Sequence, residues 1–465
     1  MYDGLMVSVS GVRGRVGEAL TPEVVAKFAA GFGTWARGWR GTAVAGAAAG
    51  PRDVVVGRDS RVSGPMFHRA TLAALQSVGC DVIDVGLAPT PTIQMAVEHH
   101  HAAGGLAITA SHNPIEWNAL KFIGPSGLFL DGSESAQMRE VVEGAFPRAT
   151  WDTLGAVRTD TEAIARHLAA VLALPFVNAP EIRRRRFRVA LDCAHGAGGA
   201  IIPALLEELG CDVVAINLET DGRFTRSPEP VAANLGELER LVRDSKADIG
   251  FATDPDVDRL ALVADDGVAI GEDWTLALAA RLVLKYRRGP VVANLSTSRI
   301  VEDVAAEAGT RVIRAPVGEV NVAVRMREEG AAIGGEGNGG VILAEVHLGR
   351  DAPVGVALLL QMLLEDNVPL SRTLAGYPRY AIVKDKLDRP NAPLDAVYDA
   401  LRRTFADAEV DTQDGLRLSW QDRWVHVRPS GTEPIVRVIA EAPDASAAHE
   451  LVARSRVPLD ALKIN

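Results

Sequence analysis

The sequence predicts an α/β protein with three related α/β modules and a smaller C-terminal α+β domain. Three observations support this fold class. The chain has 465 residues, enough for three or four domains of about 100 to 200 residues each. Its composition, with 48% hydrophobic and 23% charged residues, is that of a globular protein. A pattern of strands and helices also occurs three times before residue 370 and changes after it.

Each repeat is predicted to contain a strand, a turn of small residues, a helix and a second strand. The helices end at the glycines Gly79, Gly210 and Gly309, which are typical helix stops. The first strands are expected near 54–57, 189–192 and 291–294, and the second near 80–85, 211–216 and 310–315. A third apolar strand is expected near 106–108, 249–252 and 331–334. The alternative is that the three βα units resemble one another only generically.

A polar loop follows the third strand of each repeat, at residues 109–114, 253–259 and 335–340. Right-handed crossovers place such loops at the carboxyl ends of strands, where open α/β sheets bind their ligands. The three loops are therefore expected to share one cleft.

The pattern changes after about residue 370, where a strand-rich region begins. Strands are expected at 377–383, 415–420, 424–428 and 436–441, and helices at 396–405 and 445–455. The resulting domain boundaries are 1–155, 156–264, 265–370 and 371–465.

The formal net charge of −11 gives no overall basic surface for nucleic acid or an anionic membrane, so a small-molecule partner is favoured. The three cysteines are odd in number and form no Cys-x-x-Cys pair, which argues against disulfides and thiolate metal sites. No basic leader precedes an apolar segment, and no apolar run reaches the roughly 18 residues of a membrane span. A cytoplasmic protein is expected, and its oligomeric state, monomer or homodimer, stays open.

The first polar loop places Ser111 directly after the apolar run 104–108. Adjacent side chains of an extended segment point to opposite faces, so Ser111 and His112 are not expected to form a hydrolase dyad. No Gly-x-Ser-x-Gly elbow surrounds the serine either. One interpretation is that Ser111 caps a helix beginning near Pro114. The other is that the strand delivers its hydroxyl to a reaction.

The second polar loop carries carboxylates at alternate positions, Asp254, Asp256 and Asp258. These are hard oxygen ligands, and Mg²⁺ is the natural candidate cation. An EF-hand is excluded because Arg259 stands where its loop needs glycine. A phosphatase that uses Asp254 as nucleophile remains an alternative, as does a solvated acidic turn.

The third polar loop, residues 335–340, combines four glycines with Glu336 and Asn338. Its carboxylate and amide suit vicinal hydroxyls of a sugar. The loop lacks the Lys-Ser/Thr of a P-loop. The alternative is a structural turn.

A fourth motif, residues 428–434, offers guanidinium, hydroxyl and backbone amide donors for a phosphate. Its donors are Arg428, Ser430, Gly431 and Thr432, with Arg437 beyond them. Two further cations, Arg13 near the N-terminus and Lys121 shortly after Ser111, are candidates for the same cleft, although each could be a surface cation.

These four motifs and their order resemble the α-D-phosphohexomutase superfamily over nearly the whole chain. The resemblance implies four domains around a central cleft, the last of them a mobile lid. It implies that Ser111 is a phosphorylated serine, which donates its phosphoryl group to a sugar phosphate and is rephosphorylated from a hexose or hexosamine 1,6-bisphosphate. Asp254, Asp256 and Asp258 would hold Mg²⁺ together with an oxygen of phosphorylated Ser111.

The resemblance also implies roles for the other candidates. Lys121 would assist proton transfer, Arg259 and Arg13 would add positive charge, and His112 belongs to the motif without a firm role. Glu336 and Asn338 would bind sugar hydroxyls. The phosphate that does not react would be held by Arg428, Ser430, Gly431, Thr432 and Arg437.

The chain departs from the common family pattern in two loops. Gly340 stands where many members have histidine and Asn338 where many have serine, so the general base is unassigned. Pro255 and Val257 stand where the metal loop often has glycine, although every carboxylate is kept. This variant is most similar to phosphoglucosamine mutases of the archaeal type. Glucosamine phosphate is thus the favoured substrate, with glucose and mannose phosphates, a metal-dependent phosphatase and a non-catalytic sugar-phosphate sensor as alternatives.

Overall fold

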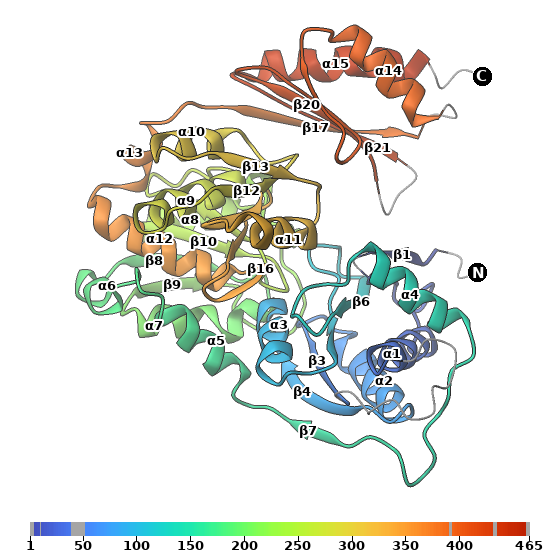
Figure 1. The fold of residues 1–465 in the computed structure, drawn as a ribbon. Coiled ribbons are helices and arrows are strands. Elements are labelled where there is room, and N and C mark those ends of the chain that lie inside the picture. Colours follow the sequence, from blue (N-terminus) through green and yellow to red (C-terminus); the bar gives the residue numbers. More distant parts are fainter. Residues whose placement is uncertain (1–3, 10, 39–51, 390–392, 431–434, 462–465) are drawn as a thin grey trace.

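The computed structural model describes residues 4–9, 11–38, 52–389, 393–430 and 435–461 of the chain (Figure 1). Within these residues, the strands form three mixed sheets and one antiparallel sheet. Figure 1 shows the first module in blue, and the C-terminal unit in red beyond the third module.

The three repeats share one strand arrangement, which confirms the predicted modules. In the first, the central strand β3 (Asp53–Arg58) lies between β4 (Asp81–Leu87) and β5 (Gly104–Ile108), and all three are parallel. The same order is formed by β9 (Asp212–Ile216), β8 (Arg188–Asp192) and β10 (Ile249–Thr253), and by β13 (Val312–Ala315), β12 (Val291–Asn294) and β14 (Ile333–Glu336). The resemblance between the units is therefore topological.

Each third strand then pairs with an antiparallel strand, which makes the sheets mixed. These strands are β6 (Trp117–Ile123), β11 (Leu260–Val263) and β15 (Gly340–Leu343). The remaining strands of the first three sheets are β1 (Met6–Ser8), β2 (Gly11–Arg15), β7 (Val157–Thr159) and β16 (His347–Arg350). The turn between β5 and β6 holds the first polar loop.

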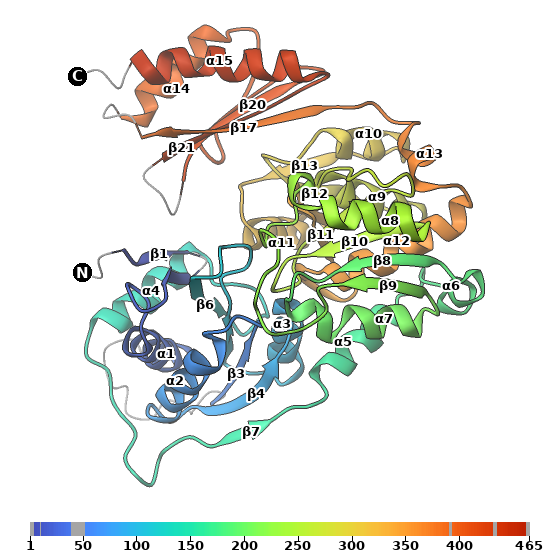
Figure 2. The same cartoon turned by 180° about the vertical axis from the view of Figure 1, so that it is seen from behind.

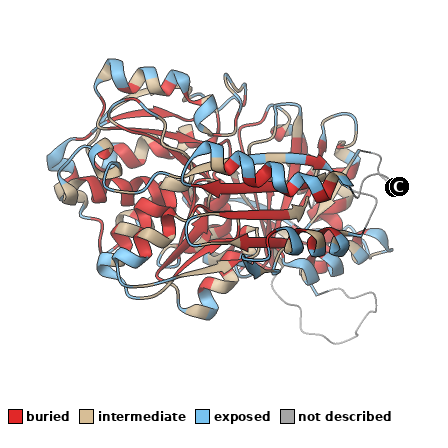
Figure 3. Ribbon diagram, turned by 90° about the horizontal axis from the view of Figure 1, so that it is seen from above, coloured by how far each residue is buried: buried red, intermediate tan, exposed pale blue. Residues whose placement is uncertain are grey.

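Helices cover the sheets, and Figure 3 shows mostly buried strands beside helices with exposed outer faces. The first module contains α1 (Pro22–Ala36), α2 (Gly64–Gln76), α3 (Thr90–His99) and α4 (Gly132–Glu143). The second contains α5 (Ala163–Leu172), α6 (Ala179–Arg185), α7 (Ile202–Glu208) and α8 (Gly236–Ser245). The third contains α9 (Asp273–Tyr286), α10 (Ile300–Glu307), α11 (Glu319–Glu329), α12 (Ala352–Asp366) and α13 (Leu370–Leu374). No described helix has the length and apolarity needed to cross a bilayer.

The second and third modules share one apolar core, which extends from Val171 to Leu370. Helix α12 explains this sharing, because its residues from Ala352 to Leu363 are all buried and it contacts α9 of its own module and α5 and α6 of the second. Helix α3 of the first module lies beside α5 (Figure 1, Figure 2). The loops of the three modules are therefore fixed relative to one another by packed helices.

The C-terminal unit is an antiparallel sheet covered by two helices and has its own core. Its elements are β17 (Ala381–Asp388), α14 (Leu394–Thr404), β18 (Glu409–Asp411), β19 (Leu416–Ser419), β20 (Trp424–Pro429), β21 (Ile435–Ala442) and α15 (Ala445–Ala461). The strand predicted at 377–383 begins later, at Ala381. The other predicted elements of this unit occur within a few residues of their expected places.

The structure excludes one of the two interpretations of Ser111. No helix begins near Pro114, because residues 111–116 form turns and β6 begins at Trp117. Ser111 therefore does not cap a helix.

Candidate active site

Ser111 lies in the turn between β5 and β6 and has only 5% of its surface exposed. Its backbone has φ near +50°, a left-handed conformation that is unfavourable for residues other than glycine. The hydroxyl Oγ donates a 2.9 Å hydrogen bond to Asp254 Oδ2, at the end of the second module's strand β10. The structure thus joins the first and second polar loops through these two side chains.

The strained serine turn is held by Arg61, a residue outside the four sequence motifs. Its guanidinium donates to four backbone carbonyls of the turn and the start of β6, those of Ser111, Asn113, Pro114 and Trp117, at 2.6 to 2.8 Å.

Asp59 orients this arginine. Its Oδ2 lies 3.2 Å from Arg61 Nε and also accepts a 2.7 Å bond from Thr109 Oγ1. Asp59 and Arg61 follow the carboxyl end of β3, next to β5, so the strand-end rule applied to first strands would have identified both.

His112 does not point away from Ser111, contrary to the expectation for an extended segment. The left-handed turn brings His112 Nδ1 to 3.4 Å from Ser111 Oγ. The charge of Arg259, together with burial and Arg13, lowers the pKa of His112 well below its ordinary value. The imidazole is therefore neutral beside the serine hydroxyl.

Asp254, Asp256 and Asp258 are buried, and one oxygen from each lies within 4.8 Å of the others. Burial and the charges of Asp258 and Asp256 raise the pKa of Asp254 well above its ordinary value. Among the described residues, Asp256 Oδ1 and Asp258 Oδ1 have no hydrogen-bond donor. Buried carboxylates that repel one another and keep oxygens without a hydrogen bond fit a hard divalent cation.

The other oxygen of Asp256 is held by the first module. Asp256 Oδ2 accepts bonds from Thr90 Oγ1 at 2.9 Å and Lys121 Nζ at 2.7 Å. Burial disfavours the Lys121 cation, but Asp256 and Asp258 outweigh it and raise its pKa above the ordinary value. Lys121 is thus a charged partner of the acidic cluster, close to the turn that carries Ser111.

The two predicted arginines both lie near the serine turn, Arg13 through Asn113 and Arg259 through Asp254. Arg13 Nη1 donates to Asn113 Oδ1 at 3.0 Å, and burial lowers the pKa of this arginine. The backbone N–H of Arg259 donates to Asp254 Oδ1 at 3.2 Å, and its Nε lies 3.7 Å from Asp258 Oδ1. Positive groups therefore surround the site where Ser111 Oγ lies.

The predicted sugar loop is joined to the metal loop through the backbone. Leu260 N–H donates to Gly339 C=O at 3.0 Å. Glu336, only 2% exposed, accepts from Asn294 Nδ2 at 2.8 Å and from Gly318 N at 3.0 Å. Asn338 Nδ2 lies 3.4 Å from Glu336 Oε2.

Three of the predicted phosphate donors, Arg428, Ser430 and Arg437, belong to the described residues and lie on or next to strands β20 and β21 of the C-terminal unit. Arg428 is paired opposite Arg437 on strands β20 and β21, and Arg428 Nη1 lies 3.7 Å from Asp414 Oδ2. Ser430 N–H donates to Ile435 C=O at 2.9 Å, and Gly431 and Thr432 lie outside the described residues. The same Asp414 Oδ2 accepts from Val317 N–H of the third module at 3.1 Å, so the unit contacts that module beside its phosphate motif.

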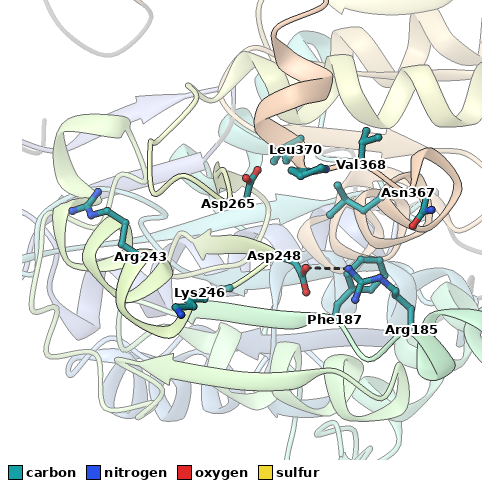
Figure 4. Close-up of a pocket in the computed structure, with 12 residues that line it drawn as sticks. Arg185, Phe187, Arg243, Lys246, Asp248, Asp265, Asn367, Val368 and Leu370 are labelled. Carbon is teal, nitrogen blue, oxygen red and sulfur yellow. Dashed lines mark hydrogen bonds and ion pairs between the residues drawn. The ribbon is translucent and has the colours of Figure 1, made fainter.

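A cavity of about 420 Å³ lies elsewhere, between the second module and the end of α12 (Figure 4). Arg185, Asp248 and Asn367 contribute to its lining, and none of the predicted site residues does. The chemistry-bearing side chains gather instead at the strand ends described above.

Four family models match consecutive parts of the chain: alpha/beta/alpha domains I, II and III of phosphoglucomutase/phosphomannomutase match residues 5–147, 165–267 and 271–380, and its C-terminal domain matches 381–456. Three modules with a C-terminal domain and an acidic cluster at the serine turn define an enzyme of the phosphohexomutase class. The chain belongs to the phosphoglucomutase/phosphomannomutase family.

Relatives and solved structures agree with this assignment. A probable phosphoglucosamine mutase of Methanopyrus kandleri is 36% identical, and a phosphoglucomutase/phosphomannomutase of Thermococcus kodakarensis is 38% identical, each match covering 96% of both chains. The structure of a phosphoglucomutase/phosphomannomutase family protein from Burkholderia thailandensis matches with a TM-score of 0.83 and 27% identity, over 99% of this chain and 98% of that one.

Proposed function

We propose that this phosphohexomutase interconverts the 6-phosphate and 1-phosphate of a hexosamine, with Ser111 as the phosphoryl carrier. The observation that carries the proposal is the bond from Ser111 Oγ to Asp254, within a buried cluster in which two carboxylate oxygens, Asp256 Oδ1 and Asp258 Oδ1, accept no hydrogen bond from the described residues. This contact supports Ser111 as the carrier, because a cation bound by the cluster would lie next to a phosphate on the serine oxygen. Asp254 is 0% exposed behind the serine, which argues against Asp254 as the nucleophile of a phosphatase.

The proposed reaction has two transfers. In the first, the bond from phosphorus to Ser111 Oγ breaks, a bond to the free O1 or O6 hydroxyl of the sugar phosphate forms, and that hydroxyl loses its proton. The resulting 1,6-bisphosphate turns around. In the second transfer, the bond between its other phosphorus and the sugar oxygen breaks, a bond to Ser111 Oγ forms, and the sugar oxygen takes up a proton. Positioning and electrostatic stabilisation dominate such transfers.

The acidic cluster would hold Mg²⁺ through Asp254, Asp256 and Asp258, with an oxygen of phosphorylated Ser111 as a further ligand. When bound, this cation would neutralise charge on the phosphoryl group. The chain itself supplies the nearby positive groups of Lys121, Arg259 and Arg13, which stabilise charge during transfer. Lys121 would also assist the movement of the hydroxyl proton, and neutral His112 lies beside the same oxygen.

In this proposal, the sugar binds to the third loop, residues 335–340, and the distal phosphate binds to the fourth motif, residues 428–434. Glu336 and Asn338 would bind sugar hydroxyls. The second phosphate would bind to Arg428, Ser430, Gly431, Thr432 and Arg437 on the C-terminal unit. Because one unit holds the distal phosphate and another the reacting one, closure of the C-terminal unit as a lid would bring both ends of the substrate into place.

The favoured substrate is glucosamine 6-phosphate. Several similar relatives are called probable phosphoglucosamine mutases, which supports the amino sugar, and one is called a phosphoglucomutase/phosphomannomutase, which keeps glucose and mannose phosphates as alternatives. A comparison of kcat/KM for glucosamine, glucose and mannose phosphates, each with its bisphosphate, would decide among them.

We also propose domain boundaries at 1–155, 156–264, 265–370 and 371–465, a cytoplasmic location and a monomer or homodimer. The matched ranges of the family models lie close to the first two boundaries, whereas the third model extends to residue 380, ten residues beyond the third boundary.

The decisive experiment follows phosphate on Ser111. Peptide mass analysis should find it phosphorylated, and incubation with labelled glucosamine 1,6-bisphosphate should exchange the label. Ser111→Ala should abolish turnover while sugar-phosphate affinity persists. A phosphatase would instead release inorganic phosphate without a bisphosphate, and a sensor would bind without turnover. Active protein without label exchange, or an active Ser111→Ala variant, would reject the mutase.

A further inference from the structure

Arg350, at the end of β16, contacts carboxylates from three parts of the fold. Its Nη2 lies 2.5 Å from Asp258 Oδ2 of the metal loop, and its Nη1 donates to Glu336 Oε2 of the sugar loop. Its Nε lies 3.1 Å from Glu319 Oε2 at the start of α11. Glu319 in turn accepts a 2.9 Å bond from Gln94 on helix α3 of the first module. One guanidinium is thus a hub between all three modules.

The hub is buried, so its charge is not a surface feature. Arg350 is 8% exposed and Asp258, Glu336 and Glu319 are between 0% and 6% exposed. Burial disfavours the cation, but Asp258 and the two glutamates outweigh it and raise the pKa of Arg350 well above the ordinary value. A buried arginine with three carboxylates is expected to hold them in fixed positions, because the planar guanidinium presents its donors in a rigid geometry.

The side chain of Arg350 runs through the space that a side chain at position 340 would fill. A Cβ atom on Gly340 would lie 2.2 Å from Arg350 Cδ and 2.8 Å from Arg350 Cγ. Both distances are far below van der Waals contact. A side chain at position 340 and this placement of Arg350 therefore exclude each other, and the glycine there is a requirement of the arginine.

Glu336 has little acceptor capacity to spare while Arg350 holds it. Its Oε1 accepts from Asn294 and Gly318, and its Oε2 accepts from Arg350 and Asn338. A carboxylate has about four lone-pair sites, so all of them are in use. The 3.4 Å contact with Asn338 is the longest of the four. A sugar hydroxyl would therefore take the place of Asn338 and bind an otherwise immobile Glu336.

We infer that Arg350 is a positioning residue that fixes the sugar-binding carboxylate Glu336 to the metal loop, and that it does so in the space left by Gly340. This inference rests on the proposed binding of the sugar at Glu336 and Asn338. Its consequence is that the sugar ring and the reacting phosphate are bound by one rigid body. Displacing Arg350 should therefore weaken recognition of the sugar and leave the distal phosphate motif unaffected.

Two substitutions displace the guanidinium in different ways. Arg350→Ala removes it. Gly340→Ala keeps its charge but forces its stem to move, which makes this variant informative even where Arg350→Ala fails to fold. In the double variant the added methyl group meets no arginine stem. Gly236→Ala is the matched control, because a Cβ there meets no atom within 4 Å.

The test measures dissociation constants by calorimetry in a Ser111→Ala background, with glucosamine 6-phosphate and with inorganic phosphate. Arg350→Ala and Gly340→Ala should each raise the constant for the sugar phosphate at least ten-fold, and that for inorganic phosphate less than two-fold. The double variant should bind the sugar phosphate no more weakly than Arg350→Ala does. Arg350→Lys should recover part of the loss, and Gly236→Ala should match the parent.

Three results would overturn the inference: an unchanged sugar-phosphate constant in folded Gly340→Ala, an equal loss for both ligands, or additive losses in the double variant. The mutase proposal is judged separately, by turnover of the unmodified enzyme. If the protein bound sugar phosphate without turnover, the mutase proposal would be rejected. The Arg350 inference would still be tested by the dissociation constants of the variants.

Discussion

Ser111 Oγ and Asp254 Oδ2 lie 2.9 Å apart, although 143 positions separate the two residues in the sequence. Two further contacts hold the first and second modules in this relative position. Thr90 donates to Asp256 Oδ2 at 2.9 Å, and Ser60 Oγ donates to His195 C=O at 2.7 Å. The serine turn and the acidic cluster are therefore assembled by the packing of two modules, and neither is complete alone.

The first prediction concerns Arg61, which bonds four carbonyls around the serine turn. Arg61→Met should lower the free energy of unfolding by about 3 to 5 kcal/mol, because it leaves the Asp59 carboxylate buried without its cation. The double variant Asp59→Asn/Arg61→Met should lose less unfolding free energy than Arg61→Met alone, because it no longer contains the unpaired carboxylate of Asp59. Urea denaturation measures both variants. If the single variant proved as stable as the double one, Asp59 would not depend on Arg61.

The same residues show how far the sequence could predict the site. The order of elements in each module follows from strand and helix patterns, and the strand-end rule places Ser111 and Asp254 at one edge. What the sequence could not supply is the shape of the turn. The extended backbone assumed for Ser111 and His112 is wrong because the bonds from Arg61 hold a left-handed conformation, and those bonds come from a loop 50 residues away.

The role of Arg350 was hidden for a related reason. Gly340 was visible only as a departure from the family pattern, and the arginine that fills its space lies one strand later. Whether a side chain from one strand fills the space beside a glycine of another depends on the three-dimensional structure. The local helix and strand preferences of the sequence do not reveal it. The shared core of the second and third modules was hidden too, because the apolar residues of α12 predict burial but not the partners.

A second prediction concerns Val257, which replaces a common glycine of the metal loop. It is fully buried and has φ near +64°, a left-handed conformation that is costly for a β-branched residue. When a buried valine is replaced, the glycine variant usually has a free energy of unfolding about 1 kcal/mol lower than the alanine variant, because of chain entropy and lost contacts. At position 257 relief of strain should offset this cost.

Val257→Gly should therefore be no less stable than Val257→Ala in thermal unfolding. Val55, equally buried in strand β3, is the control, and there the glycine variant should be the less stable of the pair. Equal behaviour at the two positions would show that the backbone at 257 carries no strain.

A third prediction follows from the repulsion within the acidic cluster. Mg²⁺ or Mn²⁺ at about 100 times its dissociation constant should stabilise the protein by about 2.7 kcal/mol, the mass-action value for one site in the folded state. Asp258→Asn should lose most of this stabilisation. In the presence of chelator, Asp254→Asn should be more stable than the parent at neutral pH, because burial and the two neighbouring carboxylates make the ionised form of Asp254 unfavourable in the folded protein. A chelated Asp254→Asn protein that melts below the parent would contradict the repulsion.

Asp273, the first residue of α9, is the basis of the last prediction. Its Oδ1 accepts a 2.7 Å bond from Ser298 N–H, and a Cβ on Gly337 of the sugar loop would lie 2.2 Å from the same oxygen. Burial raises the pKa of Asp273 to about 7; Glu441 and Glu272 add to the rise, while the Ser298 bond and Lys384 oppose it. An asparagine could keep the bond from Ser298 and would carry no charge.

Because the folded pKa of Asp273 exceeds the unfolded value of about 4, folding favours the protonated form. The stabilisation that protonated Asp273 contributes to the folded protein is fully present below about pH 4 and is lost as the pH rises through about 7. Asp273→Asn should therefore match the parent near pH 4 and exceed it by roughly 1 to 3 kcal/mol at pH 8. Urea denaturation at several pH values measures this difference. The difference in unfolding free energy between the two proteins could instead stay constant with pH or grow toward acid. Asp273 would then be ionised in the folded protein at neutral pH, with its charge stabilised by a partner such as Lys384.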